Sequence, residues 1–316
     1  MSASHRRTIG RALVVLLSAI GLFHGALAQD TVPVRIAYPS GMNGQIPVVA
    51  DRAGLADRNG LAASYNFFQN GPPMMEALAS GNVDVVVSSY QPLTTYLLQQ
   101  PGTVSIIANL GHSSYALMVD KESPARSLAE LKGKRIALSF GSDSHLDLLR
   151  AIRALGLDPA TDFTLVNLQP NDLLLVLSQR LAEAIVIRQP QVDRLQEQQD
   201  ARVLQSWPHH YLVVARTDYL ERHPSAGTRL QATLRDTVAY IANNGERASV
   251  WFGEQLRLDP RFVRQLATRN PIFEGVTDAG DAHIEFDAIH RQRFNDWLEA
   301  AFDNGLIKAR VKPYTD

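Results

Sequence analysis

The chain has 316 residues, of which 31 are Lys or Arg and 32 are Asp or Glu, so its formal net charge at pH 7 is −1. This balance argues against a nucleic-acid-binding protein, because such proteins carry a basic excess that pairs with phosphate. The chain contains no cysteine, which excludes disulfides, Cys-ligated metals and thiol nucleophiles. Its length favours two lobes over a single hydrophobic core.

Residues 1–28 have the pattern of a secretory signal peptide. Three arginines precede an apolar run from Ala12 to Phe23, and Ala26-Leu27-Ala28 then matches a small-x-small cleavage site. The apolar run is too short to span a bilayer comfortably, which argues against a membrane anchor. We therefore expect cleavage after Ala28 and a periplasmic protein. The mature chain keeps 28 basic and 32 acidic residues, a net charge near −4.

Strand and helix patterns alternate through the first part of the mature chain. β-Branched and aromatic runs predict strands, and apolar residues at helical spacing, bounded by Gly or Pro, predict helices. The β-branched run at 83–87 predicts a buried parallel strand. The expected strands are 34–38, 65–68, 83–87 and 104–108, and the expected helices are 45–57, 92–100 and one that begins at Gly71 and ends before Gly81.

A second alternating unit begins near Leu117, and the chain from Thr217 onward is expected to be mainly helical. In this part the expected strands are 135–138, 163–168, 184–187 and 211–215, and the expected helices include 172–181, 225–244 and 286–304. Such alternation predicts an α/β fold with mainly parallel sheets flanked by helices. We expect lobe 1 at 29–116 plus 214–316 and an inserted lobe 2 at 117–213. Two crossover strands would then form a hinge that can close a cleft.

The segment from Leu131 to Leu157 is the most informative part of this second unit. A short strand leads into the polar loop 140–145, and a helix with apolar residues at helical spacing follows. Free backbone N–H groups and the helix dipole make such a helix N-terminus a candidate anion site. Ser144 is expected to cap the helix, with Asp147 in the capping-box position. The alternative is an ordinary strand-to-helix turn, in which Gly and Ser are common.

Several short motifs resemble, in their order and spacing, one family of proteins. They are Arg35-Ile36-Ala37-Tyr38, 70–78 with Gly81-Asn82-Val83-Asp84, 131–137, 141–145, and Leu212-Val213-Val214-Ala215-Arg216 before His223-Pro224. The chain resembles the nitrate/sulfonate/taurine-binding family of periplasmic substrate-binding proteins of ABC importers, which includes relatives of the thiamine-pyrimidine synthase type. The resemblance implies a two-lobe, type II periplasmic-binding-protein fold. It also implies a ligand held between the lobes and delivered to a membrane permease, with no catalysis.

Loops at strand ends form the ligand site that this resemblance implies, which agrees with the rule that ligands bind beyond the carboxyl ends of strands in open α/β sheets. No catalytic residue, cofactor or metal ligand is expected. His209 and His210 are neighbours on an expected strand and should face opposite sides, which is poor metal geometry. The expected ligand-binding residues are Tyr38, Ser40, Asn43, Gln45, Ser89, Tyr90, Ser114, Tyr115, Gly141, Ser142, Ser144, His145, Arg188 and Gln189.

Arg188-Gln189 departs from the family pattern, because many members carry a Trp or an acidic residue before the following Pro. An acid there would suit the amine of taurine, whereas the planar guanidinium of Arg188 suits a carboxylate or sulfonate. This difference favours an anion without a nearby cation. The alternative is that Arg188 forms an internal salt bridge, for example with Asp143.

The sequence therefore predicts the solute-binding component of an ABC import system. Its expected partners are a small anionic organic solute of the sulfonate or carboxylate type and a permease subunit, with no nucleic acid, and we expect a monomer. The alternative is an enzyme on the same fold, either a sulfinate desulfinase or a pyrimidine synthase. The first relies on a Cys nucleophile, which this chain lacks, and the second is cytosolic, which the signal peptide opposes.

Overall fold

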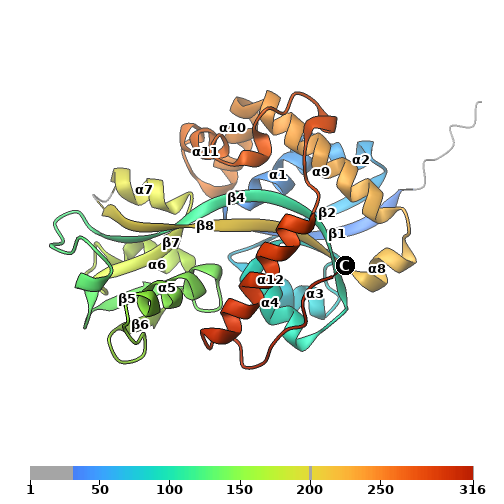
Figure 1. The fold of residues 1–316 in the computed structure, drawn as a ribbon. Helices are drawn as coiled ribbons and strands as arrows, with labels where there is room; N and C mark the ends of the chain where they lie inside the picture. The colour runs from blue at the N-terminus through green and yellow to red at the C-terminus, as the bar shows by residue number, and fades with distance from the viewer. Residues whose placement is uncertain (1–30, 199–200, 316) are drawn as a thin grey trace, which may run out of the picture. The chain divides into compact units, whose positions relative to one another are not determined.

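The computed structural model describes residues 31–198 and 201–315. The signal peptide and its cleavage site after Ala28 lie outside the described residues. Thr31–Asp316 form one compact unit, built on an eight-stranded sheet in the order β2-β1-β3-β8-β4-β7-β5-β6 (Figure 1). The strands are β1 (Val32–Pro39), β2 (Leu61–Phe68), β3 (Val85–Ser89), β4 (Val104–Asp120), β5 (Arg135–Leu138), β6 (Thr164–Asn167), β7 (Ala184–Arg188) and β8 (Ala201–Arg216).

The sheet is mainly parallel, as the sequence predicts. In the described part of the chain, β1 pairs in parallel with β2 and β3, and β5 pairs in parallel with β6 and β7. The antiparallel pairs all involve the two central strands, β4 and β8. The α/β class with crossover strands is therefore confirmed, and the parallel pairs lie toward the two ends of the sheet.

The central strands β4 and β8 are much longer than the expected strands 104–108 and 211–215. They pair from Val104 opposite Arg216 to Asp120 opposite Ala201, with a register shift between Asn109 and His112. Polar residues and Pro208 interrupt the apolar pattern here, so the sequence signal covers only part of each strand. These two strands run between the two ends of the sheet (Figure 1).

Helices cover both faces at each end of the sheet (Figure 1). The expected helix 45–57 is divided into α1 and α2, because Gly54 adopts a left-handed φ of 64°. The expected helix 172–181 begins earlier, at Pro170, and ends earlier, before the left-handed Arg180. The α-helices are α1 (Gln45–Arg52), α2 (Leu55–Arg58), α3 (Gly71–Ala79), α4 (Tyr90–Gln99), α5 (Asp143–Ala154), α6 (Pro170–Val176), α7 (Gln191–Gln198), α8 (Thr217–Arg222), α9 (Ala226–Asn243), α10 (Gly245–Leu256), α11 (Pro260–Ala267) and α12 (Ala288–Asp303).

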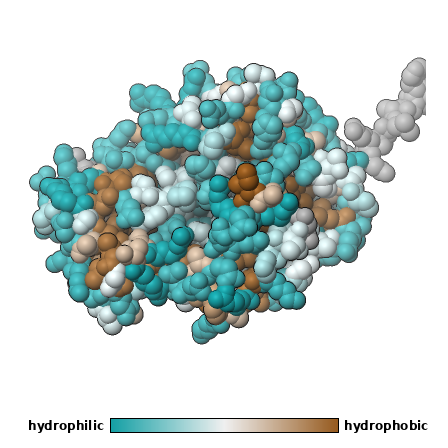
Figure 2. Space-filling view, in the orientation of Figure 1, coloured by the Kyte–Doolittle hydropathy of each residue, from teal (hydrophilic) through white to brown (hydrophobic). Residues whose placement is uncertain are grey.

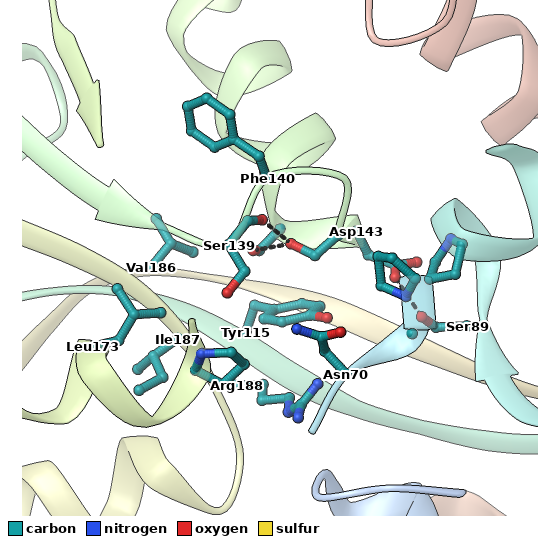
Figure 3. A pocket seen from close by; sticks show the side chains of 16 residues that line it. Asn70, Ser89, Tyr115, Ser139, Phe140, Asp143, Leu173, Val186, Ile187 and Arg188 are labelled. Carbon is teal, nitrogen blue, oxygen red and sulfur yellow. Dashed lines mark hydrogen bonds between the residues drawn. The ribbon is translucent and has the colours of Figure 1, made fainter. Parts of the chain in front are cut away.

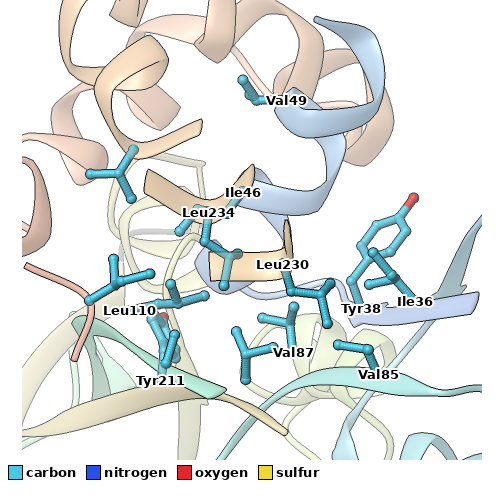
Figure 4. Close-up of a cluster of buried hydrophobic side chains, with 14 of the residues drawn as sticks. Ile36, Tyr38, Ile46, Val49, Val85, Val87, Leu110, Tyr211, Leu230 and Leu234 are labelled. Atoms are coloured by element: carbon cyan, nitrogen blue, oxygen red, sulfur yellow. The ribbon is translucent and has the colours of Figure 1, made fainter. Parts of the chain in front are cut away.

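Alternate residues of the strands enter different hydrophobic clusters, because successive side chains point to opposite faces of a sheet. In β3, Val85 and Val87 pack under α1 and α9, as Figure 4 shows, whereas Val86 packs against α3, α4 and α12. In β7, Val186 packs against α5, and Ile187 packs against α6 and α7. Each end of the sheet thus has core on both faces.

The predicted boundaries of the lobes, 29–116 plus 214–316 and 117–213, stay a prediction. The visible surface is mostly hydrophilic, with an apolar area near the end of the sheet that carries β5 and β6 (Figure 2). Leu155, Leu175 and Leu181 are each about half exposed. No helix among the described residues has the length and apolar character needed to cross a bilayer.

Candidate ligand-binding site

The carboxyl ends of strands from both ends of the sheet meet beside the central strands. On one side, the last residue of β3, Ser89, is paired with Tyr211 of β8. On the other side, the last residue of β7, Arg188, is paired with Tyr115 of β4. The Arg188 side chain also reaches Ser40, in the loop after β1. This arrangement brings loops that are far apart in the sequence to one place, where ligands bind in open α/β sheets.

A pocket of about 490 Å³, part of it open to solvent, lies at this place (Figure 3). Leu173, Val186 and Ile187 form an apolar side of the pocket, and Asp143 and Ser89 lie on another side (Figure 3). The pocket therefore combines an apolar surface with convergent polar groups.

Arg188 is the cation of this pocket, and its side chain is almost entirely buried, with the residue 8% exposed. Its Nη2 donates hydrogen bonds of 2.8 Å to Ser40 Oγ and 2.7 Å to the carbonyl oxygen of Gln69. Its Nε is buried and has no hydrogen-bond partner. Arg188 forms no ion pair with any carboxylate of residues 31–198 and 201–315, Asp143 included. A buried charge is costly without a counter-charge, so Arg188 is suited to pair with an anion.

Asp143 is the first residue of α5, and it lines the same pocket. Its Oδ2 accepts a 2.5 Å hydrogen bond from Ser89 Oγ, and its Oδ1 accepts a 3.2 Å hydrogen bond from the backbone N–H of Gln91. Burial raises the pKa of Asp143 to about 6, although these hydrogen bonds oppose the shift. The carboxylate is thus tied to the first turn of α4, where backbone donors and the helix dipole favour a negative charge.

Tyr115 and His209 are buried neutral groups beside these charges. The Tyr115 hydroxyl lies 3.1 Å from His209 Nε2, and the ring centroids are 4.2 Å apart. Burial raises the pKa of Tyr115 and lowers the pKa of His209, the latter with help from the positive charge of Arg188. His209 Nε2 also lies 3.8 Å from Asp143 Oδ2. Because His209 stays neutral at physiological pH, this contact is not an ion pair.

The N-terminus of α5 supplies further polar groups to the pocket. Ser142, with an extended backbone, is the N-cap residue, and its hydroxyl donates a 2.6 Å hydrogen bond to the Ser139 carbonyl oxygen. Ser144 Oγ lies 2.9 Å from Ser142 Oγ. The predicted capping box is wrong, because Ser144 lies inside the first turn of the helix. Asp147 is buried instead, and its Oδ2 has no hydrogen-bond partner.

The predicted ligand-binding residues fall into two groups. One group lines the pocket and the other does not, although Ser40 of the second group contacts the lining residue Arg188. Those that line it are Ser89, Tyr115, Ser142, Ser144 and Arg188. Those outside its lining are Tyr38, Ser40, Asn43, Gln45, Tyr90, Ser114, Gly141, His145 and Gln189. For all of them a contact with ligand stays a prediction.

Two predicted tyrosines outside the pocket pack in the hydrophobic core. Tyr38 packs on Phe67, with ring centroids 5.7 Å apart. Tyr90 stacks on His210, with ring centroids 5.2 Å apart, and burial raises the pKa of Tyr90. His209 points to the opposite side of β8, toward Tyr115. This opposite orientation of the two histidines agrees with the sequence prediction, and no metal-binding group of acidic or His residues occurs in the described chain.

The other residues outside the pocket lining contact neighbouring protein groups. Asn43 and Gln45 border a separate, smaller cavity, and each has a buried polar atom without a partner. Gln189 donates a 2.7 Å hydrogen bond to Asp193, and the Ser114 carbonyl oxygen accepts from the Gln189 N–H. Gly141 has a left-handed φ of 71° just before the N-cap of α5, and the ring of His145 stacks on Phe140.

Sequence reasoning missed several pocket residues. Asp143 lies in the expected polar loop 140–145 and was considered as a salt-bridge partner of Arg188, but it was not among the expected ligand-binding residues. Asn70, Gly71 and Pro72 lie in the motif 70–78, but no contact with ligand was expected from them. The other missed lining residues are Pro92, Ser139, Phe140, Pro170, Leu173, Val186 and Ile187.

Comparison with known proteins places the chain in a family. The sequence model of the family described as "NMT1/THI5 like" matches residues 45–248. The chain belongs to this family. A putative aliphatic sulfonates-binding protein of Escherichia coli is 30% identical over 316 residues, covering 97% of this chain and 94% of the relative. The taurine-binding periplasmic protein of Escherichia coli is 28% identical over 283 residues, covering 87% and 82%.

A solved structure has a similar fold. The alkanesulfonate-binding protein SsuA from Xanthomonas axonopodis pv. citri, bound to MOPS, superposes with a TM-score of 0.77 at 19% identity, covering 90% of this chain and 97% of that one. The predicted resemblance to periplasmic substrate-binding proteins is confirmed. These relatives are named as binding proteins, so the alternative of an enzyme on the same fold has no support from them.

Proposed function

We propose that this protein is the solute-binding component of an ABC import system that captures a small organic anion of the sulfonate or carboxylate type. The observation that carries the proposal is Arg188, a buried cation that lines the pocket without a carboxylate partner among the described residues. Relatives named for taurine and aliphatic sulfonates support the same class of ligand.

The pocket has the parts that such a ligand needs. The guanidinium of Arg188 attracts the anionic head group, and Ser40 and Gln69 hold one end of this guanidinium in place. The N-terminus of α5, a helix of 12 residues, adds a positive dipole end. Leu173, Val186 and Ile187 offer an apolar surface to the carbon part of the ligand.

The proposed cycle is capture, closure and delivery. The pocket lies between residues assigned to the two predicted lobes, and hydrogen bonds cross from one set to the other. Examples are Ser89 to Asp143 and Asn70 to Gln169, the latter at 2.9 Å. Ligand would strengthen this closed arrangement, and a permease would then receive the closed form. We further propose that the protein is a monomer in the periplasm and that its signal peptide is cleaved after Ala28.

Calorimetric titration tests this function. Wild-type protein, purified from the periplasm without refolding, is titrated with 1-propanesulfonate, MOPS, taurine, benzoate and nitrate. We expect a sulfonate or carboxylate to bind, and Arg188→Ala to weaken this binding. Arg135→Ala is the matched control. Arg135 is the first residue of β5, lies outside the pocket lining and forms an ion pair with Glu183. If none of these anions binds the wild-type protein, the proposal is wrong.

A further inference from the structure

We infer that Asp143 makes this pocket selective for ligands with a single negative charge and excludes ligands with two. The inference rests on the proposed function, because it concerns the same anion site. It adds that the Asp143 carboxylate, itself negative, limits the negative charge that a bound ligand can carry.

The position of Asp143 is fixed by contacts with the start of α4. Its side chain is only 3% exposed, and both of its carboxylate oxygens accept hydrogen bonds, from Ser89 Oγ and from the Gln91 N–H. These donors belong to the N-cap and the first turn of α4, a helix of 10 residues. Asp143 therefore occupies the positive end of α4, a place where a ligand anion could otherwise bind.

One formal positive charge and one formal negative charge border the pocket, and their surroundings differ. Arg188 is positive and lacks an internal carboxylate partner among the described residues, whereas Asp143 is negative above its raised pKa of about 6. Tyr115 and His209 between them are neutral, because burial shifts both pKa values away from the charged forms. Burial raises the pKa of nearby Asp147 to about 8, so it is mostly neutral at pH 7.5.

A ligand with one negative charge would pair with Arg188. Asp143 would keep its hydrogen bonds to Ser89 and to the Gln91 N–H. A second negative charge on the ligand would meet Asp143 without a further cation to offset it. Like charges repel strongly in a buried site, where water screens them poorly. The expected result is discrimination between anions of the same shape by charge alone.

The test compares two probes of similar size and tetrahedral shape at pH 7.5. 1-Propanesulfonate carries one negative charge, and ethyl phosphate carries mostly two, because the second pKa of a phosphate monoester is about 6. Calorimetric titration gives both affinities for wild type, Asp143→Asn, Asp143→Ser and the control Asp147→Asn. Asp147 is one turn further along α5, also buried, and outside the pocket lining.

We expect the wild-type protein to prefer 1-propanesulfonate by on the order of 100-fold. Asp143→Asn keeps the shape of the side chain and should reduce this preference to about 10-fold or less, mainly by improved binding of ethyl phosphate. Asp143→Ser should act in the same direction if the Asn variant folds poorly, and Asp147→Asn should keep the wild-type preference.

Two results would overturn the inference while the proposed function stands. One is a wild-type protein that binds both probes equally well. The other is an unchanged preference in the uncharged variants. A wild-type protein that binds neither probe, nor any anion of the wider panel, would overturn the proposed function and this inference with it.

Discussion

Arg188, at the end of β7, donates a 2.8 Å hydrogen bond to Ser40 Oγ, in the loop after β1. The two residues are 148 positions apart in the chain, and the bond is buried. It joins the loops at the two ends of the sheet beside the pocket, and it orients the guanidinium before any ligand arrives. Preorganisation of this kind reduces the entropy that ligand binding must overcome.

Arg188→Ala is expected to weaken binding of 1-propanesulfonate by roughly 2–5 kcal/mol, the range for truncation of one member of a buried charge pair. Arg188→Lys should restore only part of this loss, because Lys keeps the charge but lacks the planar fork. Ser142→Ala should cost less, since the backbone donors of α5 remain. Calorimetric titration and melting of the unliganded proteins measure these effects. If Arg188→Ala binds like wild type but melts earlier, Arg188 has only a structural role.

Gly41→Ala should weaken ligand binding because the new methyl group crowds Arg188. A Cβ atom at Gly41 would lie 3.3 Å from Arg188 Nε and 2.9 Å from Asn43 Oδ1, while the φ of −82° suits Ala. Asn43 Oδ1 must therefore shift, and the Arg188 side chain must move by a few tenths of an ångström, which we expect to disturb its pairing with ligand. Gly227→Ala is the control, since its nearest neighbour is Leu220 at 3.8 Å. Equal sulfonate affinity in Gly41→Ala and wild type would contradict this account.

Asp147 is expected to make the folded protein less stable as the pH rises. Burial, together with the nearby charge of Asp143, raises its pKa from 3.8 to about 8. The folded state therefore holds a proton that the unfolded state releases, so the stabilisation is fully present below pH 3.8 and is lost as the pH rises through about 8. The slope from this one group reaches about 1.4 kcal/mol per pH unit.

Asp147→Asn should remove this part of the pH dependence. Denaturant unfolding at pH 4.5 and pH 8.5 measures it, and we expect the variant to gain on the order of 2–5 kcal/mol relative to wild type between these two conditions. Part of the slope should remain, because the pKa of Asp143 is also raised. Asp172→Asn, at an exposed position of α6, is the control. Parallel stability profiles of Asp147→Asn and wild type would show that the prediction is wrong.

Ligand is expected to reduce the radius of gyration, because the predicted lobes should close around it on the long strands β4 and β8. Small-angle scattering with and without saturating 1-propanesulfonate measures the change. An unchanged radius would count against closure, although binding itself would be judged by calorimetry.

Export is expected to remove residues 1–28. The measurement is N-terminal sequencing of protein from the periplasmic fraction, with Gln29 as the expected first residue. A periplasmic protein that still begins with Met1 would contradict the predicted signal peptide.

The sequence by itself determined the local elements and their order. Hydrophobic runs such as Val85–Val87, and the short strand Arg135–Leu138 before its polar loop, carry their secondary structure in their own composition. The mainly parallel sheet follows from the alternation of such elements. Arg188 could also be singled out, because it departs from the pattern of the family that the chain resembles and its planar guanidinium suits a carboxylate or sulfonate.

Only the tertiary structure decided which of the polar residues share a pocket. Asp143 and Ser89 are 54 positions apart, and Leu173 belongs to a helix whose start the sequence placed differently. Tyr38 and Tyr90 lie near the same strand ends as the pocket residues, yet packing against Phe67 and His210 holds them in the core. Sequence patterns report the periodicity of one segment, whereas the direction of a side chain beyond the end of a strand depends on the neighbours that the fold brings to it.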